Sequence, residues 1–238
     1  MMRIGTSEPE GRERGLGAAT AALRRGQLVG LPLDTSYGIA ADAFSERGTE
    51  ALRAAKGRPD LSIPVMVPKV ATVAGLAEVD ATARRLMLDF WPGPLTLVLH
   101  AQSTLAWSLT DPAGRIAVRM PLHPVALELL ARTGPLGVVA GASVPTTSAQ
   151  SMSAPSTAPS TAPTSVLDVD SAFPPELAER LAVILDAGPM PSSAASAVID
   201  LTGARPVLVR PGTLAIDTLR ESCPGLVVPG ADDPVLAP

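Results

Sequence analysis

Cysteine and histidine are scarce in this chain of 238 residues, and aromatic residues make up only 3% of it. The one cysteine, Cys223, excludes an internal disulfide and a multi-cysteine metal site. The two histidines, His100 and His123, are too few for a histidine-rich metal centre. We therefore expect no metal site built from the chain's own side chains.

Long apolar runs are also missing. No uninterrupted apolar stretch approaches ~20 residues, so we expect no membrane span. The charged, Gly-rich first 14 residues lack the apolar core of a signal peptide. These absences predict a soluble, cytoplasmic protein. The net charge of −4 argues against non-specific coating of nucleic acid, although a local basic groove is compatible with it.

The apolar residues that are present, 46% of the chain, suffice for a buried core. Helical spacing of Ala and Leu predicts helices over residues 15–25, 46–56, 81–90, 124–132 and 214–220. Short apolar runs predict strands over residues 27–31, 63–67, 95–99, 116–118, 136–140, 183–185, 197–201 and 207–209. This alternation predicts an α/β fold with a mixed sheet.

We expect three segments to lie outside the core. We expect a flexible N-terminal tail over residues 1–14 and a C-terminal tail over residues 223–238, which leaves residues 15–222 as a single domain. Residues 133–167 contain no charged residue, and their centre repeats Ala-Pro-Ser-Thr. This composition predicts a disordered low-complexity loop at about residues 146–165, either a tolerated surface insertion or a moving lid.

Familiar catalytic motifs are absent. The sequence has no Walker-type glycine loop, no Gly-x-Gly-x-x-Gly after a strand and no Gly-x-Ser-x-Gly elbow. No spacing supports a nucleophile–histidine pair.

Cations in glycine- or proline-rich turns are more informative. Lys56 and Arg58 flank Gly57, where they can converge on one anion or simply complement a helix dipole.

Two further arginines follow apolar strands and precede turns. Arg119 precedes Met120-Pro121, and Arg210 precedes Pro211-Gly212. Each alone fits a surface salt bridge as well as a ligand site. Because α/β sheets bind ligands where strands end, these cations together predict an anion-binding cleft for phosphates and carboxylates.

The turn at residues 32–38 gathers Asp34, Thr35, Ser36 and Tyr37 after the first strand. It brings a carboxylate, two hydroxyls and a phenol into one turn. The alternative is an Asp-stabilised turn with Tyr37 packed inward.

Seven segments in this order resemble the YrdC-like threonylcarbamoyl-AMP synthase family, in its short, single-domain form. The resemblance extends from about residue 15 to 219. The matching segments are residues 32–38, 56–58, 91–96 (Trp-Pro-Gly-Pro-x-Thr), 119–124 (Arg-x-Pro-x-His-Pro), 186–188, 196–200 and 210–212 (Arg-Pro-Gly).

The resemblance implies an open, twisted mixed sheet with flanking helices around a concave basic site. It implies that L-threonine, bicarbonate and ATP, with Mg²⁺, give threonylcarbamoyl-AMP and pyrophosphate. This nucleotidyltransferase product serves the N6-threonylcarbamoyladenosine (t6A) modification of tRNA, so tRNA-modification proteins that use it are the expected partners. No protein nucleophile is needed, because catalysis would rest on positioning and electrostatics.

The resemblance also implies roles for individual residues. Threonine would contact Thr35, Tyr37, Arg119 and Ser196. Lys56 and Arg58 would hold the ATP phosphates as the catalytic pair, and Arg210 would contact the nucleotide.

The chain departs from the family at Leu33, where the family has threonine, and at Ala197, where it again has threonine. The family's Ser-Ala-Asn is replaced by Ala140-Gly141-Ala142, so Ser143 or loop amides would take over its phosphate contacts.

Two alternatives stay open: a catalytically weakened paralogue that binds nucleotide or, weakly, RNA, and a carbamoyl-adenylate enzyme with another acceptor. The lost Ser-Ala-Asn favours the first. Retention of Thr35, Arg119 and Ser196 favours threonine as the acceptor, and the net charge weakens RNA binding as the main role.

Overall fold

The computed structural model describes residues 1–34, 36–105, 107–141, 166–191 and 195–229. Thr35, Ser143 and the low-complexity loop expected at residues 146–165 lie outside the described residues.

The described helices are α1 (Pro9–Arg24), α2 (Glu46–Ala55), α3 (Ala81–Phe90), α4 (Pro124–Thr133), α5 (Val169–Ala172), α6 (Pro175–Ala178), α7 (Ile216–Ser222) and the 3₁₀ helix η1 (Val70–Gly75). The described strands are β1 (Met2–Gly5), β2 (Leu28–Pro32), β3 (Tyr37–Asp42), β4 (Val65–Met66), β5 (Leu95–His100), β6 (Arg115–Arg119), β7 (Leu136–Ala140), β8 (Val166–Leu167), β9 (Leu181–Asp186), β10 (Met190–Pro191), β11 (Ala197–Asp200) and β12 (Val207–Arg210).

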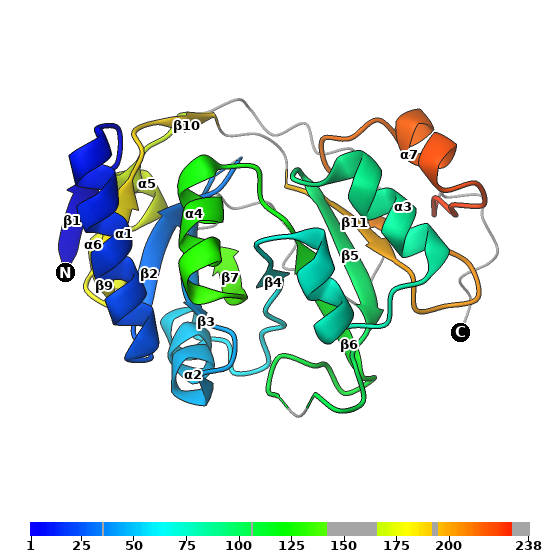
Figure 1. Ribbon diagram of the computed structural model, residues 1–238, viewed down its shortest axis with the longest axis horizontal. Coiled ribbons are helices and arrows are strands. Elements are labelled where there is room, and N and C mark those ends of the chain that lie inside the picture. The colour runs from blue at the N-terminus through cyan, green and yellow to red at the C-terminus, as the bar shows by residue number, and fades with distance from the viewer. Residues whose placement is uncertain (35, 106, 142–165, 192–194, 230–238) are drawn as a thin grey trace.

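Ten of these strands form one open sheet in the order β1-β9-β2-β3-β7-β4-β6-β5-β11-β12 (Figure 1). β9 pairs in parallel with both β1 and β2, and β5 pairs in parallel with β11. The β2–β3, β3–β7, β5–β6 and β11–β12 pairs are antiparallel. The predicted α/β fold with a mixed sheet is therefore confirmed.

Helix boundaries follow from capping side chains. Asp80 Oδ1 accepts the Ala83 N–H at 2.7 Å at the start of α3. Ser45 Oγ accepts the Gly48 N–H at 3.1 Å at the start of α2. α3 has the predicted bounds and ends before Trp91-Pro92, because proline cannot continue a helix.

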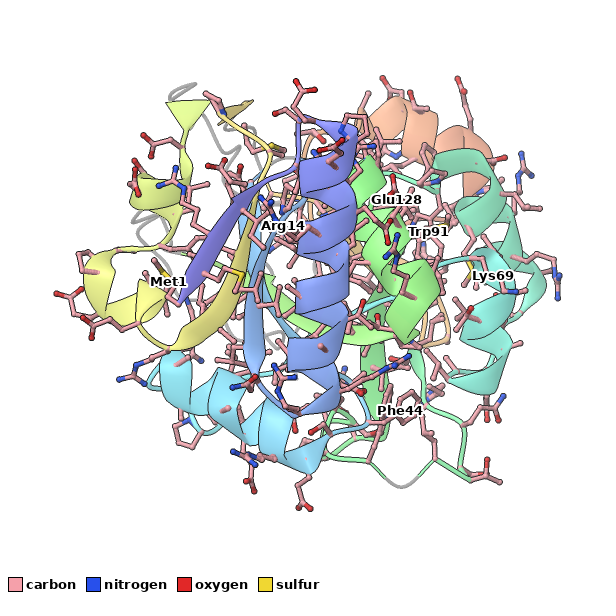
Figure 2. All side chains as sticks on the ribbon, turned by 60° about the vertical axis from the view of Figure 1, so that its left-hand side comes forward. Met1, Arg14, Phe44, Lys69, Trp91 and Glu128 are labelled. Atoms are coloured by element: carbon pink, nitrogen blue, oxygen red, sulfur yellow. The ribbon has the colours of Figure 1, made fainter. Side chains whose placement is uncertain are left out.

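Two large hydrophobic clusters hold the helices on the sheet. α1 and α4 lie side by side and pack on β2, β7 and β9 through one cluster, which includes Leu16, Leu23 and Leu129. Glu128 of α4, labelled in Figure 2, pairs with Arg12 of α1 at 3.2 Å. α3 packs beside α7, far from α1, and joins the other cluster with residues of α2 and of β3, β5 and β6 (Figure 1).

Both expected tails contain ordered structure, which corrects the prediction. Residues 1–14 form β1 and the first part of α1, because the polar segment has backbone partners: Ile4 of β1 pairs with Leu185 of β9. In the C-terminal segment, Cys223 and Leu226 are buried, and Val227 bridges to Val207. Apolar burial therefore extends the packed chain beyond residue 222.

Within the described residues, none of the helices combines the length and apolar character needed to cross a membrane.

Candidate active site

Strand alternation builds the site. In β5 and β6 the side chains of Leu95, Leu97 and Val118 join the core with α3. Their neighbours Thr96 and Arg119 must therefore point to the opposite face, because successive side chains in a strand alternate between faces. In β11 the same alternation places Val198 on that open face, opposite Ala197 and Ile199, and Ser196, directly before the strand, lines the same cavity.

This open face is hollowed into a cavity of about 360 Å³. Its size lies within the range typical of small-molecule sites. Most of its lining residues are apolar, and Arg119 and Arg210, which end β6 and β12, are among its polar ones. The lining residues are Leu33, Ser36, Leu61, Ser62, Pro64, Met66, Thr96, Ala117, Arg119, Val138, Val139, Ala140, Ala195, Ser196, Val198, Val209 and Arg210.

Arg119, the last residue of β6, is fixed at two points. Its Nε donates to the Gly93 carbonyl at 2.9 Å, and its Nη2 forms an ion pair with Asp34 Oδ2. The Arg119 side chain is only 6% exposed. Burial lowers the pKa of Arg119, while the neighbouring Asp34 carboxylate raises it. The guanidinium still lines the cavity and can meet an anion there.

Arg210 ends β12 on the same side of the cavity as Ser196. Its Nε donates to the Ser196 carbonyl at 2.9 Å, and its Nη2 donates to Ser196 Oγ at 3.1 Å. Loss of hydration lowers the pKa of Arg210, and the positive charge of Arg119 lowers it further. Among the described residues, Arg210 has no acidic partner. Its charge is therefore available to a bound anion.

The Ser196 hydroxyl also lies 3.0 Å from the hydroxyl of Thr96 on β5. Both side chains are buried, so the two hydroxyls and Arg210 form one polar network across the cavity wall. The structure thus brings together three of the predicted residues: Arg119, Ser196 and Arg210.

Lys56 and Arg58 are placed beside this network rather than in it. Lys56 follows α2, and its Nζ donates to the carbonyls of Gly141 at 2.6 Å and Ala140 at 3.2 Å. Burial lowers the pKa of Lys56. Ala140 lines the cavity, so the Lys56 ammonium contacts a residue of the cavity wall. Arg58 is 40% exposed and pairs with Asp60 at 3.6 Å.

Tyr37 lies in the core and is not among the residues that line the cavity. Its ring packs edge-on against Phe173 with centroids 5.8 Å apart. Its hydroxyl donates to the Gly188 carbonyl at 2.6 Å and accepts the Ala187 N–H at 3.0 Å. The alternative interpretation, in which Tyr37 packs inward, describes this position.

In the segment that replaces the family's Ser-Ala-Asn, close neighbours leave no room for a side chain at Gly141. A Cβ at Gly141 would lie 2.6 Å from the Ala172 carbonyl oxygen and 3.2 Å from the Phe173 ring. Alanine in the middle of the motif does not fit here without movement of the backbone. Thr35 and Ser143, the other residues expected to bind substrate, lie outside the described residues.

Asp34 and Thr96 are two residues at the site that the sequence did not predict. Thr96 carried a signal, because it is a hydroxyl at an alternate position of an otherwise apolar strand. Asp34 was noted in its turn, but its pairing with Arg119 spans 85 residues. Within the described residues, no three His, Cys, Asp or Glu side chains are placed to hold a metal ion.

Known proteins are similar to this chain in sequence and in fold. The Sua5/YciO/YrdC family model, described as telomere recombination, matches residues 21–212. A Mycobacterium tuberculosis protein assigned as a threonylcarbamoyl-AMP synthase is 39% identical over 221 residues, covering 90% of this chain and 92% of that protein. The threonylcarbamoyl-AMP synthase of Pyrococcus abyssi is 33% identical over 205 residues, which are 85% of this chain but 55% of that protein.

Solved structures agree. P. abyssi Sua5 complexed with L-threonine superimposes with a TM-score of 0.74 at 29% identity, covering 95% of this chain and 62% of that one. Escherichia coli YciO superimposes with a TM-score of 0.73 at 21% identity over 92% of this chain and 98% of its own, which supports the fold alone. This chain therefore spans somewhat more than half of the Pyrococcus protein and nearly all of the mycobacterial one. From its sequence and its fold together, the chain belongs to the Sua5/YciO/YrdC family.

Proposed function

We propose that this protein is an L-threonylcarbamoyladenylate synthase, which supplies threonylcarbamoyl-AMP for tRNA modification. The threonine amine adds to carbon dioxide derived from bicarbonate and forms a carbamate. A carbamate oxygen then attacks the α-phosphate of ATP, the bond to the β-phosphate oxygen breaks, and pyrophosphate leaves with the electron pair. AMP is thereby transferred to the carbamate, which makes the reaction a nucleotidyl transfer.

The observation that carries this proposal is that two guanidiniums, Arg119 and Arg210, line one cavity together with the Ser196 hydroxyl, to which Arg210 donates. The reaction joins a carboxylate-bearing amino acid to a polyphosphate, so it needs separate anion sites within one chamber. Fixed cations also stabilise the charge that develops at the α-phosphate, without a protein nucleophile. The relatives with threonylcarbamoyl-AMP synthase names support the same reaction.

In this proposal Arg119 binds the threonine carboxylate, and Ser196 lines the threonine pocket. Arg210 contacts the nucleotide. Lys56 and Arg58 reach the phosphates from the rim, where Lys56 exchanges its carbonyl partners for phosphate oxygens.

Thr35 and Ser143 remain predicted contacts to threonine and to phosphate. Mg²⁺ belongs to the proposal as the ion that ATP brings on its phosphates. The proposal includes a cytoplasmic location, where tRNA-modification proteins would use the product.

The test is pyrophosphate release by the purified protein with ATP, Mg²⁺ and bicarbonate, with and without L-threonine. We expect release that depends on threonine. Arg210→Gln should lower kcat/KM at least about tenfold, because hydrogen bonds to charged groups contribute about 1.5–3 kcal/mol. Arg205→Gln is the matched control, since Arg205 is exposed on the loop before the same strand and does not line the cavity.

Two results would redirect the assignment. ATP binding without turnover supports the weakened nucleotide-binding paralogue. Pyrophosphate release that responds to a different amine or hydroxyl compound, but not to threonine, supports the enzyme with another acceptor.

A further inference from the structure

The orientation of Arg119 depends on Asp34, a residue to which no role has so far been given. The Gly93 carbonyl holds Nε of Arg119, and the Asp34 carboxylate holds Nη2. Both side chains are more than nine-tenths buried, at 6% and 8% exposure. A guanidinium is planar, so two anchors at different nitrogens fix its plane and leave its remaining edge for a ligand.

Asp34 also sets the charge balance of the cavity. The described residues that line the cavity include two guanidiniums, Arg119 and Arg210, and no carboxylate. The two cations are close enough for Arg119 to lower the pKa of Arg210. Asp34, bound to Arg119, supplies the opposing negative charge. One end of the cavity is therefore a compensated ion pair, while the Arg210 end is an uncompensated cation.

This asymmetry matters for a zwitterion. An amino acid brings an ammonium group together with its carboxylate, and two uncompensated guanidiniums would repel that ammonium. Polyphosphate has no such group and is favoured by every added cation. We propose, building on the synthase function, that Asp34 is a positioning residue that orients Arg119 and makes its end of the cavity selective for a zwitterionic amino acid over a simple carboxylate.

The second oxygen of the same carboxylate supports this role. Asp34 Oδ1 is buried and has no hydrogen-bond partner among the residues that the structure describes, whereas Oδ2 pairs with Arg119. Buried polar atoms in native proteins are nearly always hydrogen-bonded, so an unpartnered one calls for an explanation. The α-ammonium of an amino acid bound at Arg119 is a donor that the proposed substrate would bring.

The test compares two ligands that differ only at the α position. L-Threonine and the matching 2,3-dihydroxybutyrate share a carboxylate and a β-hydroxyl, but the second carries a hydroxyl in place of the amine. Calorimetric titration of the full chain should show that the wild-type protein prefers threonine. Asp34→Asn keeps the shape of the side chain but removes its charge, and should lower that preference about tenfold or more.

Further variants separate charge from folding. Asp34→Glu restores the charge and should restore most of the preference, and Asp34→Ser gives a second neutral side chain in case asparagine disturbs the fold. Asp111→Asn is the matched control, because Asp111 is a partly buried carboxylate that pairs with Arg115 at 2.8 Å and does not line the cavity. It should leave the preference unchanged.

The kinetic readout gives an independent check. Asp34→Asn should raise KM for threonine while KM for ATP stays unchanged or falls, a split that general loss of structure would not produce. A wild-type protein without preference for threonine, or a neutral variant that keeps the preference, overturns the inference. Threonine-dependent pyrophosphate release by the wild-type protein reports separately on the synthase function.

Discussion

The Tyr37 hydroxyl lies 2.6 Å from the Gly188 carbonyl oxygen, and this bond joins positions 151 residues apart in the sequence. It fastens the end of β2 and the start of β3 to the turn after β9, behind the cavity wall. The ring is fully buried, and this desolvation raises the pKa of Tyr37 to about 12.

The raised pKa predicts a loss of stability in alkali. The unfolded chain ionises this phenol near pH 10, whereas the folded protein keeps the proton until about pH 12. Its contribution is therefore fully present below pH 10 and is lost as the pH rises toward 12, by roughly 2–3 kcal/mol.

Tyr37→Phe should lower the free energy of unfolding at pH 8 by about 1–3 kcal/mol, because the Gly188 carbonyl and the Ala187 N–H lose their partner. It should then lose less stability than the wild type between pH 10 and pH 11. Urea unfolding at the three pH values measures both effects. Parallel pH curves for the two proteins would contradict the assignment of the alkaline loss to Tyr37.

The Thr96–Ser196 pair predicts non-additive effects. Ser196→Ala leaves the buried Thr96 hydroxyl without its partner, and Thr96→Val leaves the Ser196 hydroxyl with Arg210 alone; each should cost about 1–3 kcal/mol. The double variant removes both hydroxyls and should cost less than the sum. A double-mutant cycle by urea unfolding gives the coupling energy, and strictly additive values would show that the two hydroxyls do not interact.

Two glycines with the same backbone conformation should respond differently to alanine. Gly57 and Gly212 both have φ of +63°, but a Cβ at Gly57 would meet open space, whereas one at Gly212 would overlap the backbone nitrogen of Ala197. Gly57→Ala should cost about 1–2 kcal/mol from the left-handed conformation alone.

Gly212→Ala adds a clash with β11 and should cost about 3 kcal/mol or more in total. It should also displace Arg210, two residues earlier, from Ser196. Thermal unfolding of the two variants gives the comparison, and equal melting temperatures would mean that the 212 turn relaxes freely.

The only two lysines in the chain should differ in how much their replacement by methionine destabilises the protein. Lys56→Met removes a charged donor from two carbonyls and should destabilise the protein by about 1–3 kcal/mol. Lys69 is exposed, so Lys69→Met should change stability by less than about 0.5 kcal/mol. Amide hydrogen exchange should also quicken at the end of β7 in the first variant only. Unchanged exchange there would show that Lys56 does not stabilise the Ala140–Gly141 backbone.

Local patterns predicted most of the fold. The span of α3 could be read directly because a capping aspartate precedes it and a Trp-Pro pair follows it. Arg119 and Arg210 do end strands, as the apolar runs before them predicted. β4 is shorter than the predicted strand at residues 63–67, because only Val65 and Met66 pair with neighbouring strands.

The errors arose where tertiary partners override local sequence. β1 is mostly exposed and carries no strong apolar signal, yet it forms a strand because β9 offers it backbone partners. The start of α1 is charged and Gly-rich, so its helical pattern was visible only from residue 15 onward. Within the site, alternation in β5 and β6 fixes which side chains face the cavity. The bond between Asp34 and Arg119 depends on packing that no local pattern encodes.

The place of β9 between β1 and β2 has a consequence for how the protein folds in the cell. A ribosome finishes β1 and β2 within the first 32 residues, but the strand that separates them ends at residue 186. Until then, the edges of two early strands lack their neighbour, and the surface beneath α1 is incomplete. Such distant parallel pairing is slow to form and leaves nascent chains prone to aggregation. Completion of this half of the sheet must therefore wait until most of the chain has been synthesised.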